Sequence, residues 1–365
     1  MGSEGEREQL NHALIGYLNT VHETLQVLDQ TAASSSEKVS WNEVIQMGEQ
    51  LSKQATMVGM LWNGEKVEVK ALEENMAAYF NILQGLLLLS HGSTVGAGPT
   101  LASCIHASVK QVVDCSFMLM KESVSSYGSS IKTQNLSIPQ LVGTVWESCS
   151  ALKKTPSTNV TAIGRAMTQV TVSIKDVLRE MKELKAASSD LEEEFKDKAS
   201  EEAESKLESD DSDADDLGND LSPEEMKIAQ LSTAVVSETL AVVNKLIRAI
   251  IGLLKQENQG AFSNSTDSLE RLLNLCQAIG SQVDELGACL YPPQEILVMK
   301  AALEKISGAV GEIQIELERI KGSSEDFVQA CTNLKSLIRQ LESELGCSNA
   351  NDLLVPKMEN LVVNS

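Results

Sequence analysis

The chain has 365 residues and a formal net charge of −22, and Phe, Trp and Tyr together make up only 3% of it. This length favours two domains over one small core, and a core with so few aromatic residues must be aliphatic, which suits helix interfaces better than sheets. The negative charge argues against direct nucleic-acid binding, because it repels the phosphate backbone, which proteins bind through clustered Lys and Arg.

The first half of the chain predicts a bundle of about six helices within residues 1–189. Apolar residues recur there in steps of three and four, which places them on one face of a helix. Breaks at the serines of 34–36, at Asn63-Gly64 and at Pro156 separate the repeats. No stretch alternates with period two, so we expect no sheet. The expected helices cover residues 10–28, 44–62, 65–90, 101–119, 141–149 and 163–184.

An abrupt change of composition marks residues 190–221 as an acidic linker. Between Asp190 and Glu225 there are 17 acidic and 3 basic residues, a net charge of −14. The apolar residues are too few to offset the entropy lost on ordering, so we expect the linker to be largely disordered. Ser205 and Ser212 each precede an acidic residue by three positions, the spacing that acid-directed kinases favour. The linker is thus either a phosphorylated regulatory segment or a solvating spacer.

The second half predicts a four-helix bundle over residues 222–346, followed by a flexible tail at 347–365. Ser222, Pro223 and Glu225 form a strong helix start, with Ser at the cap, Pro in the first turn and Glu completing a capping box. The steps of three and four are very regular here, as in the seams of antiparallel bundles. The expected helices cover residues 228–253, 269–290, 296–320 and 327–345.

No group of residues in the sequence predicts a catalytic site, a cofactor or a metal site. The glycine-rich stretch from His91 to Pro99 lacks the Lys of a P-loop and follows a helix, so we interpret it as an interhelical loop. The four histidines lack zinc-site spacing. Most of the cysteines fall on apolar stripes, where a small buried hydrophobic residue is expected. We therefore expect a protein that is not an enzyme and that acts by binding other proteins.

Two short docking motifs occur in the second half. Residues 269–273 read L-x-x-L-L, a form in which some coactivators present a helix to a groove. Within them, Arg271-Leu272-Leu273 has the R-x-L form of a cyclin-docking motif. The same leucines belong to the apolar seam of a helix, so we interpret them as core residues that are not free to dock.

The cysteines and the ends of the chain predict the compartment. Seven cysteines lie far apart without a C-x-x-C pair, a pattern typical of a reducing compartment. The first residues lack the apolar core of a signal peptide, and the longest apolar run is far shorter than the roughly 20 residues of a bilayer span. We expect a protein of the cytoplasm or nucleus without a membrane segment.

Several short motifs, taken in their order along the chain, resemble those of one known family. In the second half, Asp284 lies in a helix end that leads into Tyr291-Pro292-Pro293, and in the first half Trp146 is followed by Glu180-Met181. In this order, with an acidic insertion between the halves, they are similar to the cyclin-D-binding protein family, also described as Maid-like. The resemblance implies an all-helical protein of nucleus and cytoplasm that binds D-type cyclins and helix-loop-helix transcription regulators. It also implies negative control of cell-cycle progression or transcription.

The expected fold class is therefore all-α, with two antiparallel helical bundles joined by an acidic disordered linker. Vinculin-like and talin-like proteins also use such bundles, so a cytoskeletal or trafficking scaffold is the alternative function. Any action on helix-loop-helix factors would be sequestration, because no basic region accompanies the helices. Seams this regular can close within one chain or between two, so the oligomeric state stays open.

Overall fold

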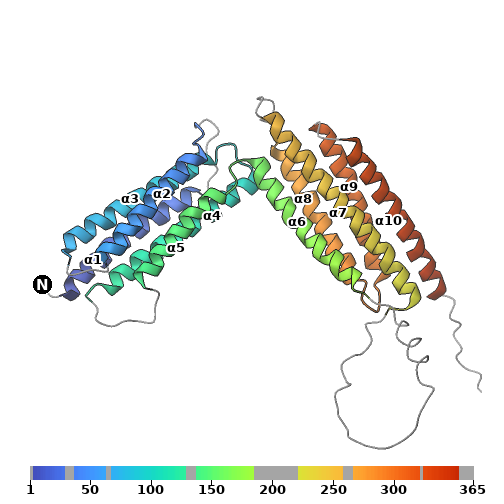
Figure 1. Cartoon of the computed structure of the whole chain (residues 1–365), viewed down its shortest axis with the longest axis horizontal. Coiled ribbons are helices and arrows are strands. Elements are labelled where there is room, and N and C mark those ends of the chain that lie inside the picture. The colour runs from blue at the N-terminus through green and yellow to red at the C-terminus, as the bar shows by residue number, and fades with distance from the viewer. Residues whose placement is uncertain are drawn as a thin grey trace, which may run out of the picture. The chain divides into compact units, whose positions relative to one another are not determined.

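Figure 1 shows the chain as a computed structural model, and the secondary structure of the part that is described consists of helices, with no strand. The expected all-α fold is therefore confirmed. None of the described helices is long and apolar enough to cross a membrane. The structure describes residues 3–28, 37–62, 67–128, 137–184, 221–257, 266–320 and 324–352. The acidic linker from 190 to 220 and most of the expected tail at 347–365 lie outside them.

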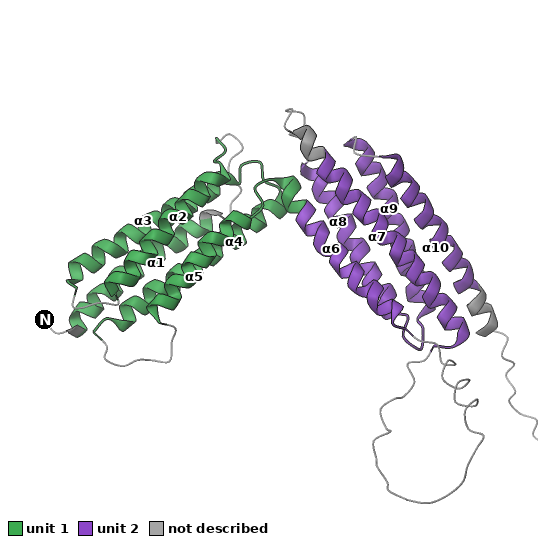
Figure 2. Ribbon diagram, in the orientation of Figure 1, with its two compact units in different colours: residues 1–163 green, residues 164–365 purple. Residues whose placement is uncertain are grey.

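Two compact units make up the chain, residues 1–163 and 164–365, drawn in green and purple in Figure 2. The helices of the first unit are α1 (Ser3–Leu28), α2 (Trp41–Trp62), α3 (Val69–Ser93), α4 (Pro99–Ser126) and α5 (Ile138–Ala151), with the short 3₁₀ helix η1 (Leu152–Lys154). The helix α6 (Asn159–Lys182) crosses into the second unit, which also holds α7 (Pro223–Glu257), α8 (Thr266–Ala288), α9 (Ile296–Arg319) and α10 (Glu325–Asp352).

In the described part of the N-terminal unit, five helices surround one aliphatic core, in the order α1, α3, α2, α5, α4 and back to α1. A ring with an odd number of helices cannot alternate in direction throughout, so one neighbouring pair must be parallel. That pair is α1 and α3. Gln9 donates a hydrogen bond to Glu73 over 2.9 Å, and about two turns further along both helices Tyr17 stacks on Phe80 with ring centroids 5.0 Å apart. The remaining neighbours are antiparallel.

The glycine-rich stretch is the turn between α3 and α4, which confirms its interpretation as an interhelical loop. The helix α3 extends further than expected, to Ser93, and Gly96 then adopts a φ of 72°, a conformation that favours glycine. The Asn159 side chain closes the turn, because it accepts a hydrogen bond from Gly98 N over 2.8 Å and donates one to Gly96 O over 2.9 Å.

In the C-terminal unit α7, α8, α9 and α10 pack as a ring of four, and α6 adds a fifth helix against α8. The predicted capping box starts α7, since Glu225 accepts hydrogen bonds from Ser222 N and Oγ over 2.9 and 2.8 Å. Lys227 pairs with Glu344 over 2.7 Å and Lys245 donates to Asp326 O over 2.9 Å, so α7 and α10 are antiparallel.

The contact between α6 and α8 depends on two glycines of α8. A Cβ atom at Gly280 would lie 2.8 Å from a methyl carbon of Val170, and one at Gly287 would lie 2.7 Å from a methyl carbon of Val177. Residue numbers rise together on both helices, which shows that α6 and α8 run in the same direction. Glycine is needed here because the valine side chain is stiff and cannot move away from an added methyl group.

The position of α6 corrects the expected division of the chain. We expected this helix in an N-terminal domain of residues 1–189, whereas the structure places the chain from Gly164 onward in the C-terminal unit. The buried face of α6 includes Thr171, Ile174 and Leu178, and its mainly apolar side chains would suit the core of either unit. An apolar stripe predicts that a helix has a buried face, but not which core that face joins.

The glycine contact predicts the effect of adding one methyl group. We expect Gly280→Ala to lower the free energy of unfolding by about 1–3 kcal/mol, the usual cost of overpacking. Combining it with Val170→Ala should recover part of that loss, because removing the valine methyl groups makes space for the added Cβ atom. At Gly308, where a Cβ atom would meet nothing within 4 Å, alanine should instead stabilise the chain by up to about 1 kcal/mol. Denaturant unfolding measures all three; equal effects at both glycines would contradict the close α6–α8 contact.

Five of the cysteines are buried small residues, as expected from their stripe positions: Cys115, Cys149, Cys276, Cys289 and Cys331. Burial raises the pKa of the Cys276 thiol to about 12 and that of Cys331 to about 11. Only the thiolate reacts readily with alkylating agents. Cys104, in contrast, is only partly buried.

These thiols predict an order of chemical modification. At about pH 8, iodoacetamide should modify Cys104 in the folded chain, while Cys276 and Cys331 should react only after unfolding, because both are shielded and protonated. Peptide mapping by mass spectrometry measures this order. Labelling of Cys276 in the folded chain as fast as Cys104 would show that the α8 core is not closed.

Candidate protein-interaction surface

The two docking motifs lie in the interior of the C-terminal unit. Leu269, Leu272 and Leu273 of α8 are all buried, with exposed fractions of 3%, 0% and 3%. Either motif would have to leave the bundle before a partner could contact these leucines. Their interpretation as core residues is therefore confirmed.

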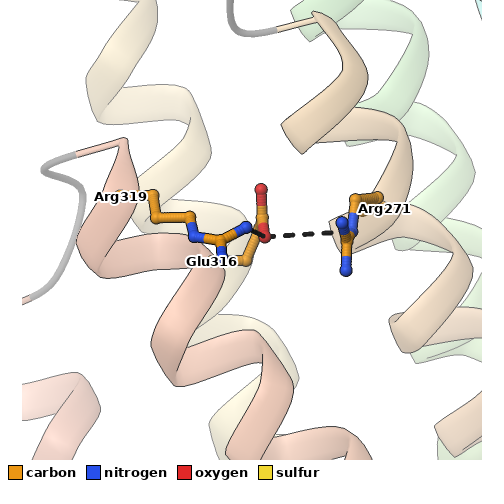
Figure 3. A network of polar contacts seen from close by, with 3 residues as sticks. All are labelled: Arg271, Glu316 and Arg319. Carbon is orange, nitrogen blue, oxygen red and sulfur yellow. Dashed lines mark hydrogen bonds and ion pairs between the residues drawn. The ribbon is translucent and has the colours of Figure 1, made fainter.

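Arg271, the arginine of the R-x-L motif, takes part in an interhelical contact of its own. Figure 3 shows it reaching from α8 toward Glu316 of α9, with Nε 3.8 Å from the carboxylate, and Arg319 lies 3.2 Å from the same oxygen. The Glu316 side chain is only 5% exposed, whereas the two arginines are 62% and 61% exposed. The buried carboxylate thus has two cations above it and connects α8 to α9.

Trp146, a residue that carries the family resemblance, joins two helices of the N-terminal unit. Its indole N–H on α5 lies 3.1 Å from Ser52 O and 3.2 Å from Thr56 Oγ1, both on α2. The residue as a whole is 47% exposed. Trp146 therefore has a structural contact on one edge and presents its apolar ring to the surface.

The other residues of the resemblance gather at the end of α8. The helix ends at Ala288, and Tyr291, Pro292 and Pro293 make the bend that leads to α9. Gln294 fixes this bend, because its side-chain amide donates to Leu290 O over 3.2 Å and to Glu225 O at the start of α7 over 3.1 Å. The bend therefore has a defined place at one end of the C-terminal unit.

A groove between α6 and α8 lies beside this bend. We call it the α6–α8 groove; its volume is about 290 Å³, and it is lined by Val177, Glu180, Met181 and Leu184 on one side and by Asp284, Gly287, Ala288 and Tyr291 on the other. Asp284 accepts a hydrogen bond from Ser173 of α6 over 3.3 Å, and Tyr291 is 43% exposed. The fold thus brings two resembling motifs, Glu180-Met181 and Asp284 with Tyr291, to one surface. The sequence alone did not predict that these motifs lie together.

The groove is small for a ligand site. Pockets for small molecules usually span about 300–1,000 Å³ and contain a few convergent polar groups. Within the described residues, no three side chains of the His, Cys, Asp and Glu types converge as metal ligands would. The size and lining of the α6–α8 groove suit one or two apolar side chains of another protein. The sequence-predicted phosphorylation sites Ser205 and Ser212 lie outside the described residues.

Comparison with known proteins decides the family. The family model described as "Grap2 and cyclin-D-interacting, N-terminal" matches residues 43–187, and its C-terminal counterpart matches residues 207–315. The chain belongs to the Grap2 and cyclin-D-interacting protein family. The family resemblance seen in the sequence is thereby confirmed.

Among relatives of this Grap2 and cyclin-D-interacting family, the chain is similar to a protein of Xenopus laevis named "Cyclin-D1-binding protein 1 homolog". The two are 22% identical over 221 residues, which cover 59% of this chain and 60% of the relative. The match therefore spans less than two thirds of the relative. The family is named for interactions and not for a reaction, which agrees with the expected lack of enzymatic activity.

The division between the two family models falls at the acidic segment, between residues 187 and 207. The division in space falls earlier, within α6. Both lining strips of the α6–α8 groove therefore lie in one spatial unit but in the two different halves that define the family.

The buried R-x-L motif predicts that its arginine is not a cyclin contact. We expect Arg271→Ala to cost less than about 1 kcal/mol of stability, because its side chain is 62% exposed and Arg319 remains 3.2 Å from the Glu316 carboxylate, and to leave binding of a D-type cyclin unchanged. Unfolding and binding titrations on the same preparation measure both. A large loss of cyclin affinity without a change in stability would show that the motif docks after all.

Proposed function

We propose that this chain is a non-enzymatic adaptor that binds D-type cyclins. The observation that carries the proposal is the paired match to the two family models named for cyclin-D interaction, over residues 43–187 and 207–315. The name of the Xenopus laevis relative, a cyclin-D1-binding protein homolog, supports it. Two helical units with exposed apolar side chains provide the surface that such a role requires.

The adaptor acts, in this proposal, as a negative regulator of cell-cycle progression or transcription. A protein that occupies a D-type cyclin or a helix-loop-helix regulator removes it from its other partners. The net charge of −22 supports sequestration over joint DNA binding, because an acidic surface is repelled by phosphates. Both partners are available to a protein of the cytoplasm and nucleus, where we place this chain.

The proposal predicts a direct complex between purified proteins. The full-length chain and a purified D-type cyclin should co-elute in size-exclusion chromatography and titrate to a defined stoichiometry in calorimetry. The control is a cyclin of another class, which should elute separately. Elution of the chain and the D-type cyclin as separate species at micromolar concentrations would contradict the proposal.

Localisation tests the alternative of a cytoskeletal or trafficking scaffold. The adaptor requires a nuclear pool of the protein tagged at its own locus. Enrichment on filaments or vesicles, without a nuclear pool, would favour the scaffold and contradict the adaptor.

A further inference from the structure

The α6–α8 groove has an apolar floor and an acidic edge. Val177, Met181, Leu184, Ala288 and Tyr291 provide the apolar lining. Glu180 and Asp284 stand on opposite sides of it, and neither forms an ion pair with any of the residues that the structure describes. Two unpaired carboxylates beside an apolar surface are complementary to a chain that carries Lys or Arg next to apolar side chains.

The ends of the helices add to this negative potential. The helices α6 and α8 run in the same direction, and the lining comes from residues 177–184 and 284–291, at and just beyond their C-terminal ends. The C-terminal end of a helix carries about half a negative charge, and the last turn of α8 contains no basic residue to balance it. The end of α8 therefore favours a cation at the groove, whereas the last turn of α6 carries Arg179 and Lys182 of its own.

The basic residues of α6 are not placed to neutralise the groove. Arg179 pairs with Asp176 over 3.2 Å. At 3.6 residues per turn, Lys182 lies roughly 140° around the helix from Val177, on the side away from the lining. Two further carboxylates, Glu285 and Glu295, lie near Cys289 at the end of α8. The pKa of the Cys289 thiol is raised mainly by burial and, to a smaller extent, by these two negative charges. The surroundings of the groove are thus acidic.

The dimensions of the groove indicate a helical occupant. The helical parts of the lining, residues 177–182 and 284–288, cover six and five residues, which at 1.5 Å per residue is about 8 Å, or one and a half turns. A helix of a partner protein that lies in the groove between α6 and α8 would place two apolar side chains, one turn apart, within this length. Its neighbouring Lys or Arg residues would then stand beside Glu180 and Asp284.

Charge argues against the two occupants that this chain itself offers. The segment that follows Leu184, residues 185–220, contains 15 acidic and 4 basic residues. A second copy of the chain carries a net charge of −22. Either would bring negative charge to a negative groove, which costs free energy that a cationic partner gains.

We infer that the α6–α8 groove is the docking site for a basic amphipathic helix of a protein partner, with two apolar side chains in the groove and Lys or Arg beside Glu180 and Asp284. The inference rests on the proposed adaptor function, because it names the surface and the kind of partner segment that the adaptor receives. It concerns the C-terminal unit alone.

The test uses a fluorescent Ala-based helical peptide with two Leu residues one turn apart and flanking Lys residues, titrated into the full-length chain. We expect Glu180→Lys with Asp284→Lys to weaken binding about tenfold or more. The control, Glu312→Lys with Glu318→Lys on the exposed face of α9, changes the net charge equally and should have a small effect. Equal weakening by both pairs would reduce the binding to general attraction and overturn the inference.

A second readout locates the peptide. Binding should shift the methyl resonance of Met181, which lines the groove, and leave that of Met299, buried in α9, in place. An unchanged Met181 signal at saturation would overturn the inference. So would tighter peptide binding by Leu191→Ser with Phe195→Ser, because this would show that the chain's own segment occupies the groove.

The outcome separates the inference from the proposed function. If the unsubstituted chain binds a D-type cyclin but the peptide fails both readouts, the groove assignment is wrong and the adaptor function stands. If the peptide binds as expected and the cyclin does not bind at all, the groove is right and the cyclin assignment is wrong.

Discussion

Close contact between two helices requires small residues where their backbones approach, and the attachment of α6 to the C-terminal unit depends on one such contact. Gly280 and Gly287 of α8 leave room for Val170 and Val177 of α6. The contacts lie seven residues apart on both helices, so the helices stay in register over two turns. In this register Asp284 lies level with Ser173 of α6 and Glu180 lies further along that helix, so that both carboxylates border one apolar groove near the helix ends.

The sequence predicted the helices well but not the assignment of each helix to a core. Regular steps of three and four locate a buried face, and Ser222 with Glu225 locates a helix start, because both signals are local. The partner of α6 is not a local property. One signal was present: glycine inside a helix costs about 1 kcal/mol relative to alanine, so Gly280 and Gly287 on an apolar face required a packing reason. They could have identified α8 as the helix that receives a close neighbour.

The candidate site was predictable only in its parts. Arg271-Leu272-Leu273 could be interpreted correctly as core, since its leucines fall on the seam of α8 and the structure buries them. Glu180 and Asp284 lie more than one hundred residues apart, on either side of the acidic segment, and nothing in their own surroundings predicts that they line one groove. An abrupt change of composition marked the end of a domain, whereas packing continues across it from α6 to α8.

The central claim is that α6 belongs to the C-terminal unit and packs on α8 through its glycines. The most direct measurement is the nuclear Overhauser effect between the methyl protons of Val177 and the α protons of Gly287 in the isotopically labelled full-length chain. The account predicts a strong cross-peak, because the methyl carbon lies 2.7 Å from where a Cβ atom of Gly287 would stand. With both resonances assigned, the absence of that cross-peak would contradict the account.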